Sequence, residues 1–66
     1  MIDRNAIKKM IGERGYKQKV IAEKAKVTER QLSLILSGKR KCDVDEYIRI
    51  CIALEVPVAT FILQDL

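Results

Sequence analysis

Side chains that could perform covalent or metal chemistry are scarce in this chain of 66 residues. It contains no His and no Trp, and Cys42 and Cys51 are its two thiols. Without an imidazole a Ser-His or Cys-His nucleophilic pair cannot be assembled, and two thiols cannot supply the four ligands of a structural zinc site. A domain of this size is also too small for a convincing catalytic cleft. We therefore expect a protein that is not an enzyme and that takes no cofactor, metal or small-molecule ligand.

Positive charge is the chemistry that the chain does carry, and it is unevenly distributed. Thirteen Lys and Arg residues against nine Asp and Glu residues give a net charge of +4. Residues 1–41 hold 12 basic and 4 acidic side chains, a net of +8, whereas residues 42–66 hold 1 basic and 5 acidic, a net of −4. A basic block of this kind attracts polyanions. Charge alone is equally compatible with a solvated surface that keeps the protein in solution.

Composition places the chain among ordinary folded domains. Apolar residues make up 48% of it, which is typical of a globular protein. No apolar run approaches the ~18 residues that a bilayer span needs, and the first residues lack the apolar stretch of a signal peptide. We expect one domain over residues 1–66 in a reduced, cytoplasmic protein that does not contact membranes.

Apolar residues recur with helical spacing along the chain, and no segment alternates with a period of two. Asp3 is suited to cap a first helix that ends before Gly15, and a second short helix is predicted from about residue 17 to 25. Thr28 and Gln31 have the spacing of a capping box, which predicts the start of a third helix.

The second half of the chain continues in the same way. Asp43 and Glu46 predict a second capping box and a fourth helix over roughly 44–54. Pro57 then precedes a short fifth helix over about 58–63. The predicted fold is therefore all-α: a compact bundle of five short helices.

The second and third helices, joined by a tight turn, match the helix-turn-helix pattern. This part of the sequence resembles the lambda-repressor and Cro-like helix-turn-helix family, and the similarity covers nearly the whole chain. The segments that fall where the family has them are the Gln18…Ile21-Ala22 start, the Val27-Thr28 turn, the Ser37-Gly38-Lys39-Arg40 exit and Leu54-Glu55-Val56-Pro57.

The sequence departs from the family pattern at two places. The family often has Arg and Glu, as a buried ion pair, where this chain has Ile11 and Leu36. Because both charges are replaced together, no buried ion is left unpaired, and we expect these two side chains to meet in the core. Lys26 stands where the family usually has Gly, so we expect a non-glycine residue with positive φ in the turn.

The resemblance implies that the third helix enters the major groove of DNA, with the second helix across the backbone. Helical spacing turns Leu32, Ile35 and Leu36 inward. Arg30 suits guanine, Gln31 suits adenine, and a Glu can accept from cytosine N4; each of these residues could instead be exposed without a partner. The expected base-reading residues are Glu29, Arg30, Gln31, Ser33 and Leu34.

Residues that flank the motif could hold the phosphate backbone. The side-chain amide at the start of the second helix and the backbone N–H groups beside it suit a phosphate, and in the family the matching Gln has this role. For each lysine a solvated position is equally compatible. The expected phosphate contacts are Lys17, Gln18, Lys19, Thr28, Ser37, Lys39, Arg40 and Lys41.

The fourth helix has more apolar residues than one buried face can cover. Its core-facing positions are expected to be Val44, Tyr47, Ile50, Cys51 and Leu54. Ile48 and Ile52 would then lie outside, and such a patch marks a contact surface. We expect a homodimer interface built from Ile48 and Ile52, joined by Phe61, Ile62 or Leu63. The alternative is that residues 58–66 cover this patch within one monomer.

Together these features predict a bacterial or phage-type transcriptional regulator that binds double-stranded DNA in a sequence-specific manner. We expect a repressor that acts as a homodimer on a near-palindromic operator. The alternative is a protein-interaction module, such as an antitoxin-like or phage-control protein, whose apolar C-terminal half binds a partner protein.

Overall fold

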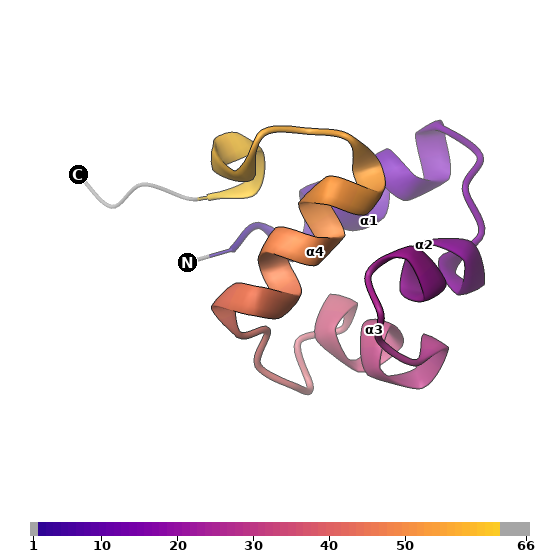
Figure 1. Cartoon of the computed structure of the whole chain (residues 1–66), viewed down its shortest axis with the longest axis vertical. Coiled ribbons are helices and arrows are strands. Elements are labelled where there is room, and N and C mark those ends of the chain that lie inside the picture. Colours follow the sequence, from indigo (N-terminus) through magenta and orange to yellow (C-terminus); the bar gives the residue numbers. More distant parts are fainter. Residues whose placement is uncertain (1, 63–66) are drawn as a thin grey trace.

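The computed structural model describes residues 2–62, which form four α-helices and one 3-10 turn. Figure 1 shows α4 lying across the face of the bundle, with α1 behind it and the α2–α3 pair at its side. The elements are α1 (Arg4–Glu13), α2 (Gln18–Lys24), α3 (Glu29–Leu36), α4 (Val44–Leu54) and η1 (Val58–Phe61). The all-α prediction is confirmed. No helix among the described residues has the length and apolar character to span a bilayer.

Short-range side-chain caps fix where three helices begin. The Asp3 carboxylate accepts from the backbone N–H of Ala6 at the start of α1. The capping boxes predicted for Thr28 with Gln31 and for Asp43 with Glu46 are both present. Each cap satisfies N–H groups that a helix start leaves without a partner, and a cap is worth about 1 kcal/mol.

All four helices end in the same backbone arrangement. A left-handed residue follows each helix, its N–H bonds back three residues, and the next N–H bonds back five, as in a Schellman motif. Gly15 and Gly38 occupy this position after α1 and α3, as expected for a residue without Cβ. Lys26 (φ 58°) and Glu55 (φ 59°) occupy it after α2 and α4. The positive φ predicted for Lys26 is therefore confirmed.

The core lies between α4 and the other helices. α2 packs against both α3 and α4, α1 packs against α3, and η1 contacts α1 and α4. Ile11 and Leu36 belong to one buried cluster, and each is 4% exposed. Aliphatic side chains thus stand in the core where the family often has an ion pair, and no buried charge needs a partner. Other members of the cluster are Ile7, Ile21, Ala22, Leu32, Tyr47, Ile50, Cys51 and Leu54.

The C-terminal part of the described chain differs from the prediction in one respect. Instead of an α-helix over 58–63, it forms the single 3-10 turn η1, and Ile62 then pairs with Ile2 in an antiparallel bridge. The backbone N–H of Asp3 donates to the Phe61 carbonyl at 2.7 Å beside this bridge. The chain leaves helical geometry here because its backbone pairs with the N-terminal segment.

Replacing Lys26 with Gly tests the left-handed turn. The substitution removes about 1 kcal/mol of steric strain but gives the unfolded chain about 0.4–1 kcal/mol more conformational entropy. We therefore expect the free energy of unfolding of K26G, measured by urea denaturation, to equal that of the wild type or to be slightly higher. The matched control K24G replaces the last residue of α2, where the backbone is helical, and should lose up to about 1 kcal/mol of unfolding free energy. A loss of more than about 1 kcal/mol in K26G would contradict the assignment.

Candidate nucleic-acid interface

The turn between α2 and α3 is built from backbone hydrogen bonds. The N–H of Lys26 donates to the Glu23 carbonyl at 3.2 Å, and that of Val27 donates to the Ala22 carbonyl at 3.0 Å. Ala22 is 2% exposed, so its small side chain lets the two helices approach closely. Arg49 of α4 adds a long-range tie, since its Nε donates to the Ala25 carbonyl at 2.7 Å. The positive guanidinium there also interacts favourably with the negative, C-terminal end of the α2 dipole.

One face of α3 is buried and the other is open, as the spacing predicted. Leu32, Ile35 and Leu36 are 0 to 4% exposed. Among the five predicted base-reading residues, Glu29, Arg30 and Ser33 are exposed, whereas Gln31 and Leu34 are half-buried. The exposed face therefore presents a carboxylate, a guanidinium and a hydroxyl within two turns of helix.

Gln31 is already engaged within the protein. Its Oε1 accepts from the Thr28 backbone N–H at 2.9 Å, and its own backbone N–H donates to Thr28 Oγ1 at 3.0 Å. Two-point pairing with adenine uses both the oxygen and the nitrogen of the carboxamide. The capping box thus occupies one of the two acceptor positions of Gln31 Oε1 and leaves the side-chain NH₂ fully available. The sequence prediction for this residue did not take this double use into account.

Cationic side chains surround the exposed face of α3. Lys17 and Lys19 at the start of α2 are exposed, and so are Lys39 and Lys41 in the loop that follows α3. Gln18, between the first two lysines, is half-buried. We call residues 37–41 the exit loop. In it, the Ser37 hydroxyl donates to the Leu34 carbonyl at 3.1 Å.

Not every cation of the basic block is available to a ligand. Arg40 Nη1 lies 2.8 Å from Glu46 Oε2, and the Glu46 side chain is 7% exposed. Arg14 Nη1 donates to the Leu54 carbonyl at 2.8 Å, at the end of α4. These two arginines hold elements together, which charge counting could not distinguish from a ligand-binding role. Glu46 itself both caps α4 and holds Arg40.

The predicted dimer surface is partly corrected. Ile48 and Ile52 are 38% and 67% exposed, as expected. Val44 was expected in the core but is 73% exposed, because it opens α4 and lies on the Ile48 face, four residues earlier. We call Val44, Ile48 and Ile52 the apolar stripe.

The three C-terminal interface candidates have different outcomes. Phe61 was expected in the interface, and this is wrong: it is 2% exposed and belongs to the core. The Tyr47 hydroxyl fixes this segment, since it donates to the Val58 carbonyl and accepts from the Phe61 N–H. Ile62 is 48% exposed, and Leu63 lies outside the described residues.

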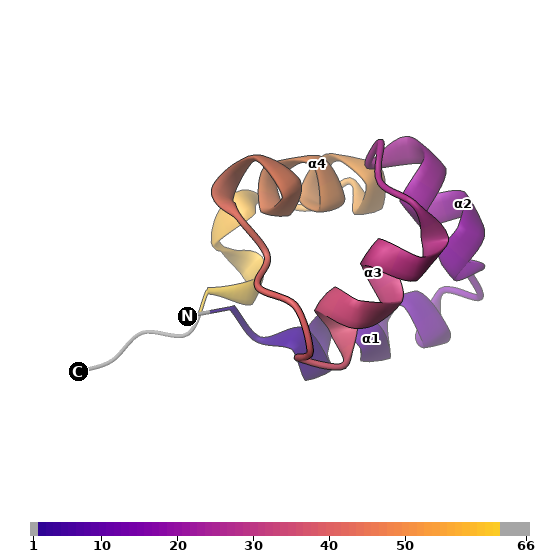
Figure 2. The same ribbon diagram turned by 90° about the horizontal axis from the view of Figure 1, so that it is seen from below.

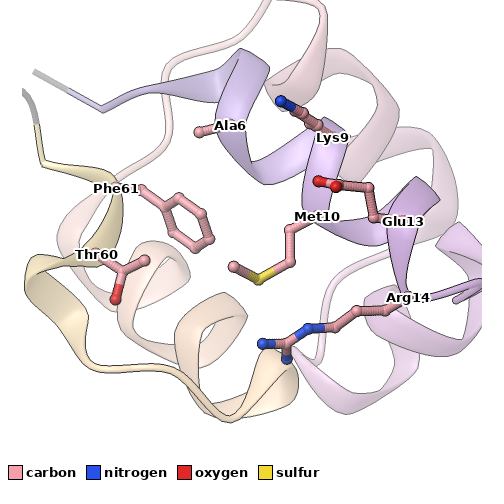
Figure 3. A pocket seen from close by; sticks show the side chains of 7 residues that line it. All are labelled: Ala6, Lys9, Met10, Glu13, Arg14, Thr60 and Phe61. Carbon is pink, nitrogen blue, oxygen red and sulfur yellow. The ribbon is translucent and has the colours of Figure 1, made fainter.

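A pocket of about 400 Å³ lies between α1 and η1 (Figure 3). In this view the Met10 side chain extends toward the Phe61 ring, and Arg14 lies at the far end. None of the candidate DNA-contacting residues lines this pocket. Its lining residues are Ala6, Lys9, Met10, Glu13, Arg14, Thr60 and Phe61.

The two cysteines are free thiols with little reactivity. Cys51 is fully buried. Burial, together with the nearby carboxylates of Glu46 and Asp43, raises the pKa of Cys42 to about 11. Within residues 2–62 no group of three or more His, Cys, Asp or Glu side chains is placed to hold a metal ion.

An all-helical domain with this turn and this open helix face is a helix-turn-helix DNA-binding domain. A helix-turn-helix family model matches residues 7–61, and the chain belongs to that family. The family is that of Cro/C1-type DNA-binding transcription regulators, in agreement with the resemblance seen in the sequence. A comparison with curated proteins gives no match.

The raised pKa of Cys42 can be tested by thiol alkylation followed by mass spectrometry. Since the pKa rises from 9.0 to about 11, the thiolate fraction at pH 8 should be roughly 100-fold lower than that of an unperturbed thiol. We expect the alkylation rate to keep rising up to about pH 11. The same chain unfolded in urea should react at the ordinary rate. A folded-state rate that levels off near pH 9 would contradict this environment for Cys42.

Proposed function

We propose that the protein is a transcriptional repressor that binds a near-palindromic operator in double-stranded DNA as a homodimer in the cytoplasm. The observation that supports DNA reading is the open face of α3, with lysines at the start of α2 and in the exit loop on either side. Phosphate contacts position such a domain, and base contacts give it sequence preference. In this arrangement α3 lies in the major groove.

The chemistry of each α3 side chain suits a different contact with the bases. Arg30 is the strongest candidate for base reading, because its exposed guanidinium can pair with guanine O6 and N7. Glu29 can accept a hydrogen bond from cytosine N4. The Ser33 hydroxyl can donate to or accept from a base edge. Gln31 contributes its NH₂ group while its oxygen stays in the capping box. Leu34 packs against a thymine methyl group.

The phosphate contacts come from both sides of α3. Gln18 with Lys17 and Lys19 lies at the start of α2, Thr28 lies in the turn, and the exit loop supplies Ser37, Lys39 and Lys41. Arg40 contributes less than a free cation because Glu46 shares its charge. If a dimer engages about eight phosphates, the logarithm of affinity should fall with the logarithm of salt at a slope of about −7.

The apolar stripe on α4 supports dimerisation. Its three side chains and Ile62 are exposed in the monomer, and covering such surface is favourable. A two-fold arrangement would place two copies of α3 about 34 Å apart, one turn of DNA. The same stripe supports a second candidate function, in which a different protein covers it and the domain acts as a partner-binding module.

Arg30→Ala tests base reading. Duplexes selected from a random pool by the wild type should bind R30A about 5- to 150-fold more weakly, which corresponds to a loss of about 1–3 kcal/mol, and one base position per half-site should lose its preference. The matched control is Lys9→Ala, which removes the same charge from α1 and should leave the selected sequence unchanged. If R30A selects the same sequence with the same preference, Arg30 does not read a base.

Ile48→Asp with Ile52→Asp tests the apolar stripe. Light scattering at about 100 µM should give a dimer for the wild type and a monomer for the double variant, because the charges cannot be buried. Val20→Asp, at an exposed position on α2, should remain dimeric. A wild-type monomer both with and without DNA would rule out the homodimer. DNA binding that survives in the double variant while a cellular partner is lost would favour the partner-binding module.

A further inference from the structure

Arg4, the first residue of α1, lies against the end of α3. Figure 2 shows the loop after α3 passing beside the start of α1. We propose that Arg4 and Lys41 together hold a phosphodiester group of the DNA backbone, in a site that extends the interface beyond the helix-turn-helix. The inference rests on the proposed function and adds to it a contact from α1.

The guanidinium of Arg4 lies beside Gly38 in the exit loop. A Cβ atom added at Gly38 would lie 2.9 Å from both Cζ and Nη2 of Arg4, which is closer than such atoms approach. Gly38 also has a φ of +80°, which favours glycine. The Arg4 guanidinium therefore lies over the backbone at the end of α3, in space that a Cβ atom at position 38 would also occupy.

The surroundings of Arg4 suit an anion. A pocket of about 420 Å³ opens here, and its lining residues are Ile2, Arg4, Gly38, Arg40, Lys41 and Cys42. Three of the six carry a positive charge. Glu46 balances Arg40 at 2.8 Å, whereas Arg4 and Lys41 are exposed and have no ion-pair partner among residues 2–62. Two uncompensated cations thus share one concave surface.

The geometry favours a phosphate fixed in DNA as the ligand. A guanidinium presents a planar fork of N–H donors that matches two phosphate oxygens, and a lysine adds a point charge. The pocket adjoins the exit loop, where Ser37 and Lys39 are already proposed to contact the backbone. A single duplex lying along α3 can therefore reach the pocket as a continuation of the same strand.

The test is the salt dependence of binding, measured by fluorescence anisotropy. The probes are a duplex selected from a random pool by the wild-type protein and a scrambled duplex of equal length. Arg4→Gln should make the slope of log affinity against log salt shallower by about one per bound protomer, and Lys41→Gln should do the same. Both should weaken the two duplexes by the same factor, because a phosphate contact carries no base preference.

Matched variants separate this contact from general charge and from folding. Lys9→Gln removes one charge from another face of α1, where the side chain lines the pocket of Figure 3, and should leave the slope unchanged. Arg4→Lys retains the charge and should retain the slope. Thermal unfolding checks that each variant is folded. If R4Q lowers stability, Arg4→Met, which keeps the aliphatic stem without the charge, repeats the test at a temperature below its unfolding transition.

The outcomes distinguish this inference from the proposed function. A wild-type slope near −7 that R4Q leaves unchanged, or changes no more than K9Q does, would overturn the Arg4 site alone. A wild-type slope near zero on both duplexes would overturn the proposed function and the site with it. An Arg4-dependent rise in melting temperature with inorganic phosphate at constant ionic strength, without an effect on DNA binding, would assign the pocket to a free anion and overturn its assignment to DNA.

Discussion

The placement of α3 against α2 depends on a single left-handed residue. Lys26 at φ 58° lets two backbone hydrogen bonds close the end of α2, and the chain then turns directly into the cap of α3. Arg49 reinforces the same point from α4 by donating to the Ala25 carbonyl. The turn is thus determined by backbone geometry and one long-range arginine, while the exposed side chains of Arg30 and Ser33 on α3 take no part in it.

Three arginines of the chain make hydrogen bonds that stabilise the fold. Arg14, Arg40 and Arg49 each donate to a protein oxygen at 2.7–2.8 Å. A hydrogen bond from a charged group stabilises a fold by about 1.5–3 kcal/mol, which matters in a domain of this size. The exposed positive charge is therefore carried mainly by lysines and by Arg4 and Arg30, while Arg14 is exposed but hydrogen-bonded to Leu54.

Local signals in the sequence were sufficient to predict most of the fold and the open face of α3. The caps at Asp3, Thr28 and Asp43 involve residues three apart, so their spacing alone predicts them. Burial of Phe61 depends on contacts with distant residues such as Tyr47, and local spacing cannot reveal it. Exposure of Val44 depends in the same way on where the core ends. The closeness of Arg4 to Gly38 joins residues 34 positions apart in the sequence, so local spacing cannot reveal it either.

Glu46 links the two surfaces of the proposed regulator. Its carboxylate accepts from the Asp43 N–H at the start of α4 and pairs with Arg40 in the exit loop. The helix that carries the apolar stripe is therefore tied to the loop that leaves α3. In the proposed dimer, contact between two stripes would fix α4, and through Glu46 it would fix the exit loop and the end of α3. The spacing of the two α3 helices would then follow from the packing of α4. A dimer of such small domains would therefore prefer operators whose half-sites lie at that distance.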